Sequence, residues 1–268
     1  MISSIFDQAL TLLPLLIGAY ITISLLKLPD FSLESAYLFG AVVGYLLRDM
    51  PLPVMLTGAS LGGALVGAIV STLNQCFKLP YLLAAIITNG LFHGLTHYFL
   101  GTSIQSFHSG EMLFEPFLFT LIIVVGFVLR SEMGYSLSIY GNNPHFFEHH
   151  PVSGRYTIYF GVMLGHGCAG IGGLLFALSN GFVDLPMSFG LILLCLTALI
   201  LGKSLIRTRH PNILIPVLGL FVYLGVQQTI LKLGFNLKYF NAFQAIFVLV
   251  FLIFTYRKQK VSLDHLGV

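Results

Sequence analysis

The sequence is poor in charge: only 9% of its 268 residues are Asp, Glu, Lys or Arg, and it contains no Trp. A soluble domain carries about 25% charged residues, so a sizeable soluble domain is excluded. Three cysteines show no metal-ligand spacing and lie in or beside apolar segments, which favours packing roles for Cys76, Cys168 and Cys195. The first ten residues lack the basic region and cleavage site of a removable signal, so we expect the first apolar helix to remain in the mature protein.

Long apolar runs are what the sequence has instead. Hydrophobic residues make up 56% of the chain and the mean hydropathy is +0.91. A helix needs about 20 apolar residues to cross a bilayer, and the sequence predicts an all-α polytopic membrane protein with eight or nine membrane segments. We expect these near residues 8–27, 32–47, 53–75, 81–100, 115–130, 156–179, 186–203, 212–231 and 239–256. The second is short, so we expect it to be broken or re-entrant, within a single transmembrane domain over residues 1–268.

The distribution of Lys and Arg predicts the orientation, because cytoplasmic loops are enriched in both. Simple alternation of the segments gathers most of the basic residues on one side: Lys27, Lys78, Arg130, Arg155, Lys203, Arg207, Arg209, Arg257, Lys258 and Lys260. Only Arg48, Lys232 and Lys238 fall opposite. We therefore expect the 131–155 loop and the C-terminus to be cytoplasmic.

Two apolar helices are preceded by polar, interrupted segments. Asp30, Ser32 and Glu34 open the second membrane segment, and carboxylates in hydrocarbon are costly. They must therefore lie at a helix start, at the water interface or along a path through the protein. A similar interruption in the second half of the chain contains Phe182, Asp184 and Met187. Interrupted segments in corresponding halves predict a permeation site where the two meet.

Other polar residues inside the expected spans can be interpreted either as structural or as functional residues. Asn89 needs a hydrogen-bond partner or water, which makes it a candidate for the pathway. His93 and His97 are one helical turn apart, yet no carboxylate or cysteine follows at a useful spacing. We expect hydrogen bonding between helices or a polar lining, not metal binding. His166 lies in a glycine-rich stretch and is expected to pack against a neighbouring helix.

The loop around residue 145 matches the inverted zinc-protease pattern H-x-x-E-H, from His145 to His149. Proline lies immediately before this pattern and again two residues after it, and no acidic third ligand is evident downstream. The alternative is a short amphipathic helix on the cytoplasmic face, begun by Asn142 or Asn143 as cap. Pro144 would take its first position, and Phe146 and Phe147 would face the membrane surface or a partner protein. The role of the cluster formed by His145, His149 and His150 stays open.

Four segments, in order, resemble one family: residues 28–36, 82–89, 141–144 and 181–188. They are similar to the permease subunits of ATP-binding-cassette importers of the branched-chain amino acid and ribose class. Within that class the chain looks closest to the small permeases of tryptophan- and tyrosine-type uptake systems. The similarity extends over roughly residues 8–250.

The resemblance implies partners and roles. It implies a permease in the bacterial inner membrane, working as a homodimer with cytoplasmic ATPase subunits and a periplasmic or lipid-anchored solute-binding protein, with no role for nucleic acid. ATP would be bound by the ATPases, because the chain has no glycine-rich phosphate loop; it is then not an enzyme and holds no cofactor or metal of its own. Gly141 to about His150 would form the coupling helix seated on the ATPase. Asp30, Phe31, Ser32 and Glu34 would lie near the translocation path, and the solute would be small and polar or amino-acid-like, an aromatic amino acid being the best guess.

A different class of function uses the same residues. A secondary transporter driven by protons or sodium would use Asp30 or Glu34 as the coupling carboxylate and would need no ATPase. It leaves the Gly141–Pro144 element without a purpose, and charged residues within the spans are few.

Overall fold

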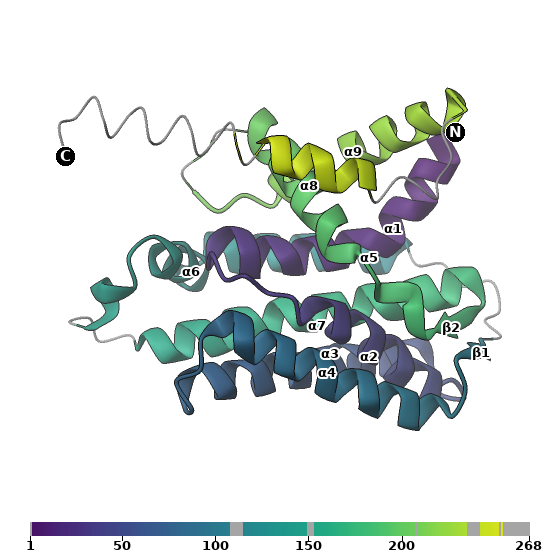
Figure 1. Ribbon diagram of the computed structural model, residues 1–268, viewed down its shortest axis with the longest axis horizontal. Coiled ribbons are helices and arrows are strands. Elements are labelled where there is room, and N and C mark those ends of the chain that lie inside the picture. Colours follow the sequence, from purple (N-terminus) through teal and green to yellow (C-terminus); the bar gives the residue numbers. More distant parts are fainter. Residues whose placement is uncertain are drawn as a thin grey trace.

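The computed structural model describes residues 2–107, 115–148, 153–206, 208, 210–234, 242–251 and 253. The chain is almost entirely helical (Figure 1). Its elements are α1 (Ile2–Ala19), the π-helix η1 (Tyr20–Leu25), α2 (Leu33–Leu46), α3 (Leu52–Gln75), α4 (Tyr81–Leu100), β1 (Ile104–Ser106), α5 (Glu115–Arg130), α6 (Glu132–Asn142), the 3-10 helix η2 (Pro144–Glu148), α7 (Gly154–Asn180), β2 (Phe182–Asp184), the 3-10 helix η3 (Leu185–Ser188), α8 (Leu191–Leu205) and α9 (Leu214–Lys232). A further apolar helix covers Ala242–Phe251.

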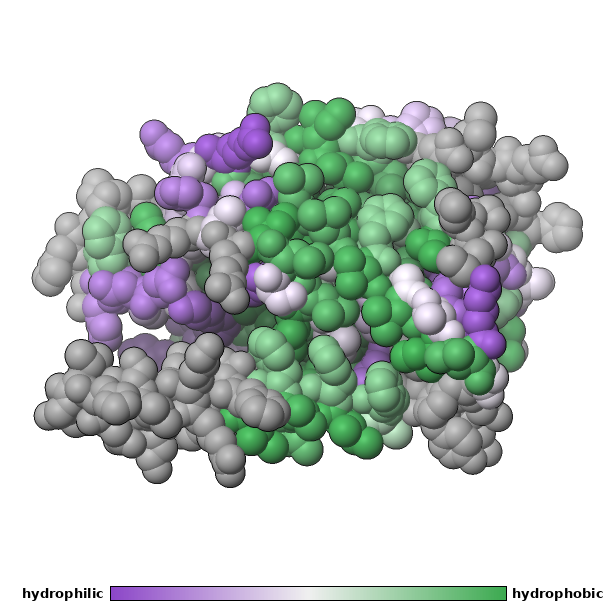
Figure 2. Space-filling model, turned by 90° about the horizontal axis from the view of Figure 1, so that it is seen from above, coloured by the Kyte–Doolittle hydropathy of each residue, from purple (hydrophilic) through white to green (hydrophobic). Residues whose placement is uncertain are grey.

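Five helical segments of the described residues are long and apolar enough to cross a membrane: Ile5–Leu25, Leu52–Gln75, Gly154–Asn180, Leu185–Leu205 and Leu214–Lys232. The pair α5 and α6 adds a sixth if it forms one span, bent by 65°. Hydrophobic side chains fill the middle of the face in Figure 2, whereas hydrophilic ones gather toward its ends. The protein is therefore an all-α polytopic membrane protein, while the expected eight or nine segments stay a prediction.

Helix α7 lies at the centre of the fold and packs against α1, α2 and α3. Small residues allow this close approach. A Cβ added at Gly173 would collide with the backbone carbonyl of Tyr37 in α2, and one at Gly63 in α3 would collide with the carbonyl of His166. The glycine-rich stretch of α7 thus brings helix backbones into direct contact.

The second membrane segment, expected near residues 32–47 to be broken or re-entrant, is one short continuous helix, α2, and the irregular backbone lies before it. The chain leaves η1 at Lys27, whose φ of 55° lies in the left-handed region, and α2 begins only at Leu33. Irregular backbone at membrane depth is tolerated where protein covers it, and Asp30 and Ser32 are buried at 2% and 0% exposure. Helix α2 therefore starts inside the protein, and not at its surface.

Two short strands join distant parts of the chain, a feature that the sequence does not predict. Strand β1 pairs with β2 in antiparallel register, with Ile104 opposite Asp184. The pair lies at one end of the molecule, and α6 lies at the opposite end (Figure 1). The connection after α4 is thereby tied to the connection after α7.

Candidate functional site

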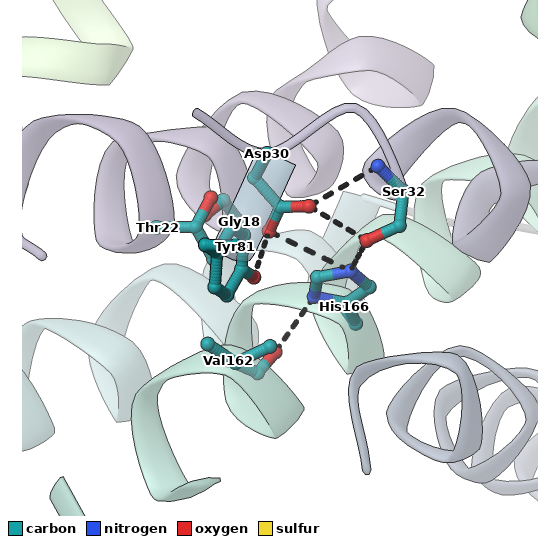
Figure 3. A network of polar contacts seen from close by, with 7 residues as sticks. All are labelled: Gly18, Thr22, Asp30, Ser32, Tyr81, Val162 and His166. Atoms are coloured by element: carbon teal, nitrogen blue, oxygen red, sulfur yellow. Dashed lines mark hydrogen bonds and ion pairs between the residues drawn. The ribbon is translucent and has the colours of Figure 1, made fainter. Parts of the chain in front are cut away.

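A buried polar cluster formed by Asp30, Ser32, Tyr81 and His166 fixes the start of α2 (Figure 3). Asp30 Oδ1 accepts hydrogen bonds from the Ser32 hydroxyl at 2.6 Å and from the Ser32 backbone N–H at 3.1 Å. Its Oδ2 accepts from the Tyr81 hydroxyl at 2.9 Å and lies 3.6 Å from His166 Nε2. One carboxylate thus joins the segment before α2 to α4 and α7.

The hydrogen bonds of this cluster require one shared proton. His166 Nδ1 lies 2.8 Å from the Val162 carbonyl, which can only accept, so Nδ1 is protonated. Nε2 lies 2.9 Å from Ser32 Oγ, whose single proton is donated to Asp30. In one arrangement Nε2 is also protonated and donates to Ser32 Oγ, while Ser32 donates to Asp30. In the other, the Asp30 carboxyl carries the proton and Ser32 donates its own proton to Nε2. Either arrangement makes the cluster neutral overall, which is the form that a membrane interior tolerates.

The two interrupted segments meet at Glu34. Its Oε1 accepts a hydrogen bond of 3.1 Å from the backbone N–H of Ile192, in the first turn of α8. The first amides of a helix lack partners within it and favour a negative charge. A carboxylate from the first half of the chain therefore occupies the N-terminus of the helix that follows the second interruption.

A cavity of about 550 Å³ lies beside this meeting point. It is lined by residues 23 and 27–31 of the first half and by Ile192 and Leu196 of α8. The ring of Phe31 is 44% exposed, whereas Asp30 is almost covered. Ligand cavities in proteins commonly measure about 300–1,000 Å³, so the space is large enough for an amino-acid-sized solute.

The remaining expected pathway residue has a partner in α2. Asn89 Oδ1 accepts a hydrogen bond from the Ser35 hydroxyl, which joins α4 to α2. Asn89 is partly exposed and lies apart from the residues that line the 550 Å³ cavity. The structure thus brings Asp30 and Phe31 to the cavity, places Ser32 and Glu34 next to it, and holds Asn89 on another face of α2.

The second interruption has a different form from the first. Phe182 and Asp184 belong to β2, and Met187 belongs to η3, which precedes α8. Gly190 then adopts a φ of 84° before α8 begins. The residues expected to interrupt this half thus form a strand and a 3-10 helix next to the strand pair.

The expected coupling segment differs in detail from the helix that the sequence suggests. Gly141 and Asn142 are the last residues of α6, Asn143 caps that helix at its C-terminus, and Pro144 opens η2, a 3-10 helix of five residues. The single helix from Gly141 to about His150 is therefore wrong as far as residue 148, and residues 149–152 lie outside the described part. Phe146 is 44% exposed and Phe147 is 8% exposed, with ring centroids 5.5 Å apart.

The end of α6 is fixed to the end of η1. A Cβ on Gly141 would collide with the backbone carbonyl of Leu25, so only glycine allows this contact. Next to it, Lys27 Nζ donates a 2.6 Å hydrogen bond to Asn142 Oδ1. Residues 141–142 thus contact the segment that leads directly into Asp30.

The sequence analysis did not identify Tyr81 as a functional residue, and it assigned His166 to helix packing and not to the buried cluster. A histidine within an apolar, glycine-rich helix is itself a signal, because polar groups in a span need partners. The sequence does not identify the partner, which lies 136 positions away in Asp30. Within the described residues no group of three His, Cys, Asp or Glu side chains could hold a metal ion; His149, needed for the zinc pattern, lies outside them.

The fold and these contacts define the class: a multi-pass helical membrane protein in which the interrupted start of α2 and the first turns of α8 lie beside a cavity. Residues 1–254 match the family described as branched-chain amino acid transport system / permease component, and the chain belongs to this family.

Two relatives are similar to this chain over most of its length. A tyrosine transport system permease protein of Clostridioides difficile (strain R20291) is 26% identical over 94% of this chain and 90% of that protein. An uncharacterized protein of Rickettsia prowazekii (strain Madrid E) is 25% identical over 77% of this chain and 78% of its own length. No solved structure matches.

Proposed function

We propose that this chain is the membrane-spanning subunit of an ATP-driven importer that moves an aromatic amino acid or a similar small solute into the cytoplasm. Family membership and the name of the Clostridioides difficile relative support this proposal. ATPase subunits on the cytoplasmic side supply the energy, and a periplasmic or lipid-anchored binding protein delivers the solute. The permease lies in the inner membrane with its C-terminus in the cytoplasm.

The observation that carries the proposal is a continuous set of contacts from the coupling segment to the cavity. The 3-10 helix η2 follows α6, whose last residues contact Leu25 and Lys27. Lys27 and Phe31 both line the 550 Å³ cavity. A displacement of η2 by an ATPase would reach the cavity through these contacts, over a few residues.

A second copy of the chain is expected to pack against α4. Gly90 and Gly94 form a Gly-x-x-x-Gly pair with open space where a Cβ would stand, and the neighbouring His93 and His97 are exposed. Such a pair permits close helix–helix approach, and if α4 crosses the membrane, as the sequence predicts, its exposed imidazoles favour a protein partner over lipid. This face of α4 is the one we assign to the homodimer.

The test is uptake of radiolabelled tyrosine into liposomes that contain this chain, a candidate ATPase subunit and a candidate binding protein. We expect uptake to require ATP and all three components, and to continue when ionophores remove ion gradients. Uptake by the chain alone under a proton or sodium gradient would instead establish the secondary-transporter function and refute the importer.

A further inference from the structure

A second cavity, of about 500 Å³, lies between the ends of η1, α6 and α8 and the segment that precedes α9. Its polar lining contains Lys27, Lys203 and a set of hydroxyl, amide and imidazole groups, namely those of Tyr20, Ser24, Ser138, Asn142, Thr208 and His210. None of the described residues that line it is acidic. The cavity differs from the one beside α8 that we assign to the solute, although Lys27 lines both.

Two observations indicate that this cavity is built for an anion. Lys27 uses one of its three N–H groups on Asn142, and no described carboxylate lies among the lining residues to pair with either lysine. In addition, the Ser24 hydroxyl oxygen is buried without a hydrogen-bond partner among the described residues. An unpaired buried hydroxyl is costly, and a bound acceptor would remove that cost.

We propose that this cavity binds a phosphate group, either as the headgroup of an anionic phospholipid or as free phosphate. Lysine is a common phosphate ligand, and the hydroxyls of Ser24 and Ser138 can donate to the remaining oxygens. Basic pockets between transmembrane helices are known to hold lipid headgroups. Apolar lining residues, among them Leu25, Ile206 and Ile215, provide room for the glycerol end of a lipid. The occupant would join α6 to η1 and α8.

The first experiment measures how fast an amine-reactive reagent acylates Lys203 in the purified wild-type chain. In phospholipid-free detergent, inorganic phosphate should slow the acylation of Lys203 about fivefold, while Lys78, a basic residue outside the cavity, should be unaffected. In nanodiscs, phosphatidylglycerol should give the same protection relative to phosphatidylcholine alone if the source is a lipid. Protection by either source supports the proposal and identifies the source.

The second experiment uses variants and native mass spectrometry of retained phosphatidylglycerol. Lys203→Gln and Ser24→Ala should each weaken retention, Lys203→Gln by about tenfold because a charge-assisted hydrogen bond is lost. Lys78→Gln should match wild type. If neither phosphate nor phosphatidylglycerol protects Lys203, or if acetate protects it equally well, the proposal is wrong. The acylation measurement needs no variant, so a variant that fails to fold leaves the proposal testable.

Discussion

Asp30 is only 2% exposed and contacts three separate parts of the fold. Its carboxylate oxygens accept hydrogen bonds from the Ser32 and Tyr81 hydroxyls, and Oδ2 lies 3.6 Å from His166 Nε2. If the neighbouring cavity holds a solute, the exposed ring of Phe31 would meet it, whereas the Asp30 carboxylate is already occupied by hydrogen bonds within the protein. Asp30 therefore positions α2, and we expect its replacement to lower the free energy of unfolding.

Replacing Asp30 by Ala should lower the free energy of unfolding by about 3 kcal/mol, because it leaves His166 buried without its partner. His166→Ala should be similar, and the double variant should lose less than the sum of the two. Unfolding in mixed micelles, followed by far-ultraviolet circular dichroism, measures all three. Asp49→Ala, at an exposed turn, is the control and should change little. Strict additivity of the two single losses would contradict the shared-proton cluster.

Glu34→Gln should lower the free energy of unfolding by about 1 kcal/mol, because a full negative charge is lost at the N-terminus of α8. The same denaturant titration measures it. Glu132→Gln is a matched control, since Glu132 is an exposed acid in the first turn of α6. An unchanged stability for Glu34→Gln, or an equal loss for both variants, would exclude the inter-helix role of Glu34.

A comparison of the expected with the observed helices shows which parts of the fold the sequence predicts. Apolar length and proline positions indicated the long apolar helices but not α6, which lies within the expected 131–155 loop, and the acids of residues 30–34 pointed to the irregular segment before α2. The partners of those acids could not be read, because Asp30 meets His166 and Glu34 meets Ile192 across more than half the chain. Asn142 and Asn143 favour a helix start, and η2 does begin at Pro144 directly after them, but the sequence does not show that α6 already runs through Asn142, which bonds Lys27.

The two phenylalanines of η2 should separate coupling from folding. Phe147 is buried, so Phe147→Ala should cost about 3 kcal/mol of stability. Phe146 is largely exposed, and Phe146→Ala should leave stability nearly unchanged while reducing co-purification of the ATPase about tenfold. Pull-down with a tagged ATPase, beside thermal unfolding, measures both. Equal ATPase recovery by Phe146→Ala and wild type would remove η2 from the coupling interface.

On the scale of the whole molecule, α7 forms the centre, whereas α4 keeps an exposed face with open space at Gly90 and Gly94. Leucine at either glycine should therefore leave the monomer folded but weaken self-association, by about tenfold if close packing is lost. Single-molecule mass measurement in detergent tests this. Gly225→Leu is the matched control, because its glycine also faces open space but lies in α9. A dimer that survives both α4 substitutions would place the interface elsewhere.

The shared proton of the buried cluster has an electrical consequence. A membrane potential does work of about 2.3 kcal/mol per 100 mV on each elementary charge that crosses the field. Asp30 and His166 together carry no net charge in either arrangement, so a movement that carries the cluster as one unit would displace no net charge through that field. The resting voltage of the cell would then neither drive nor oppose such a movement.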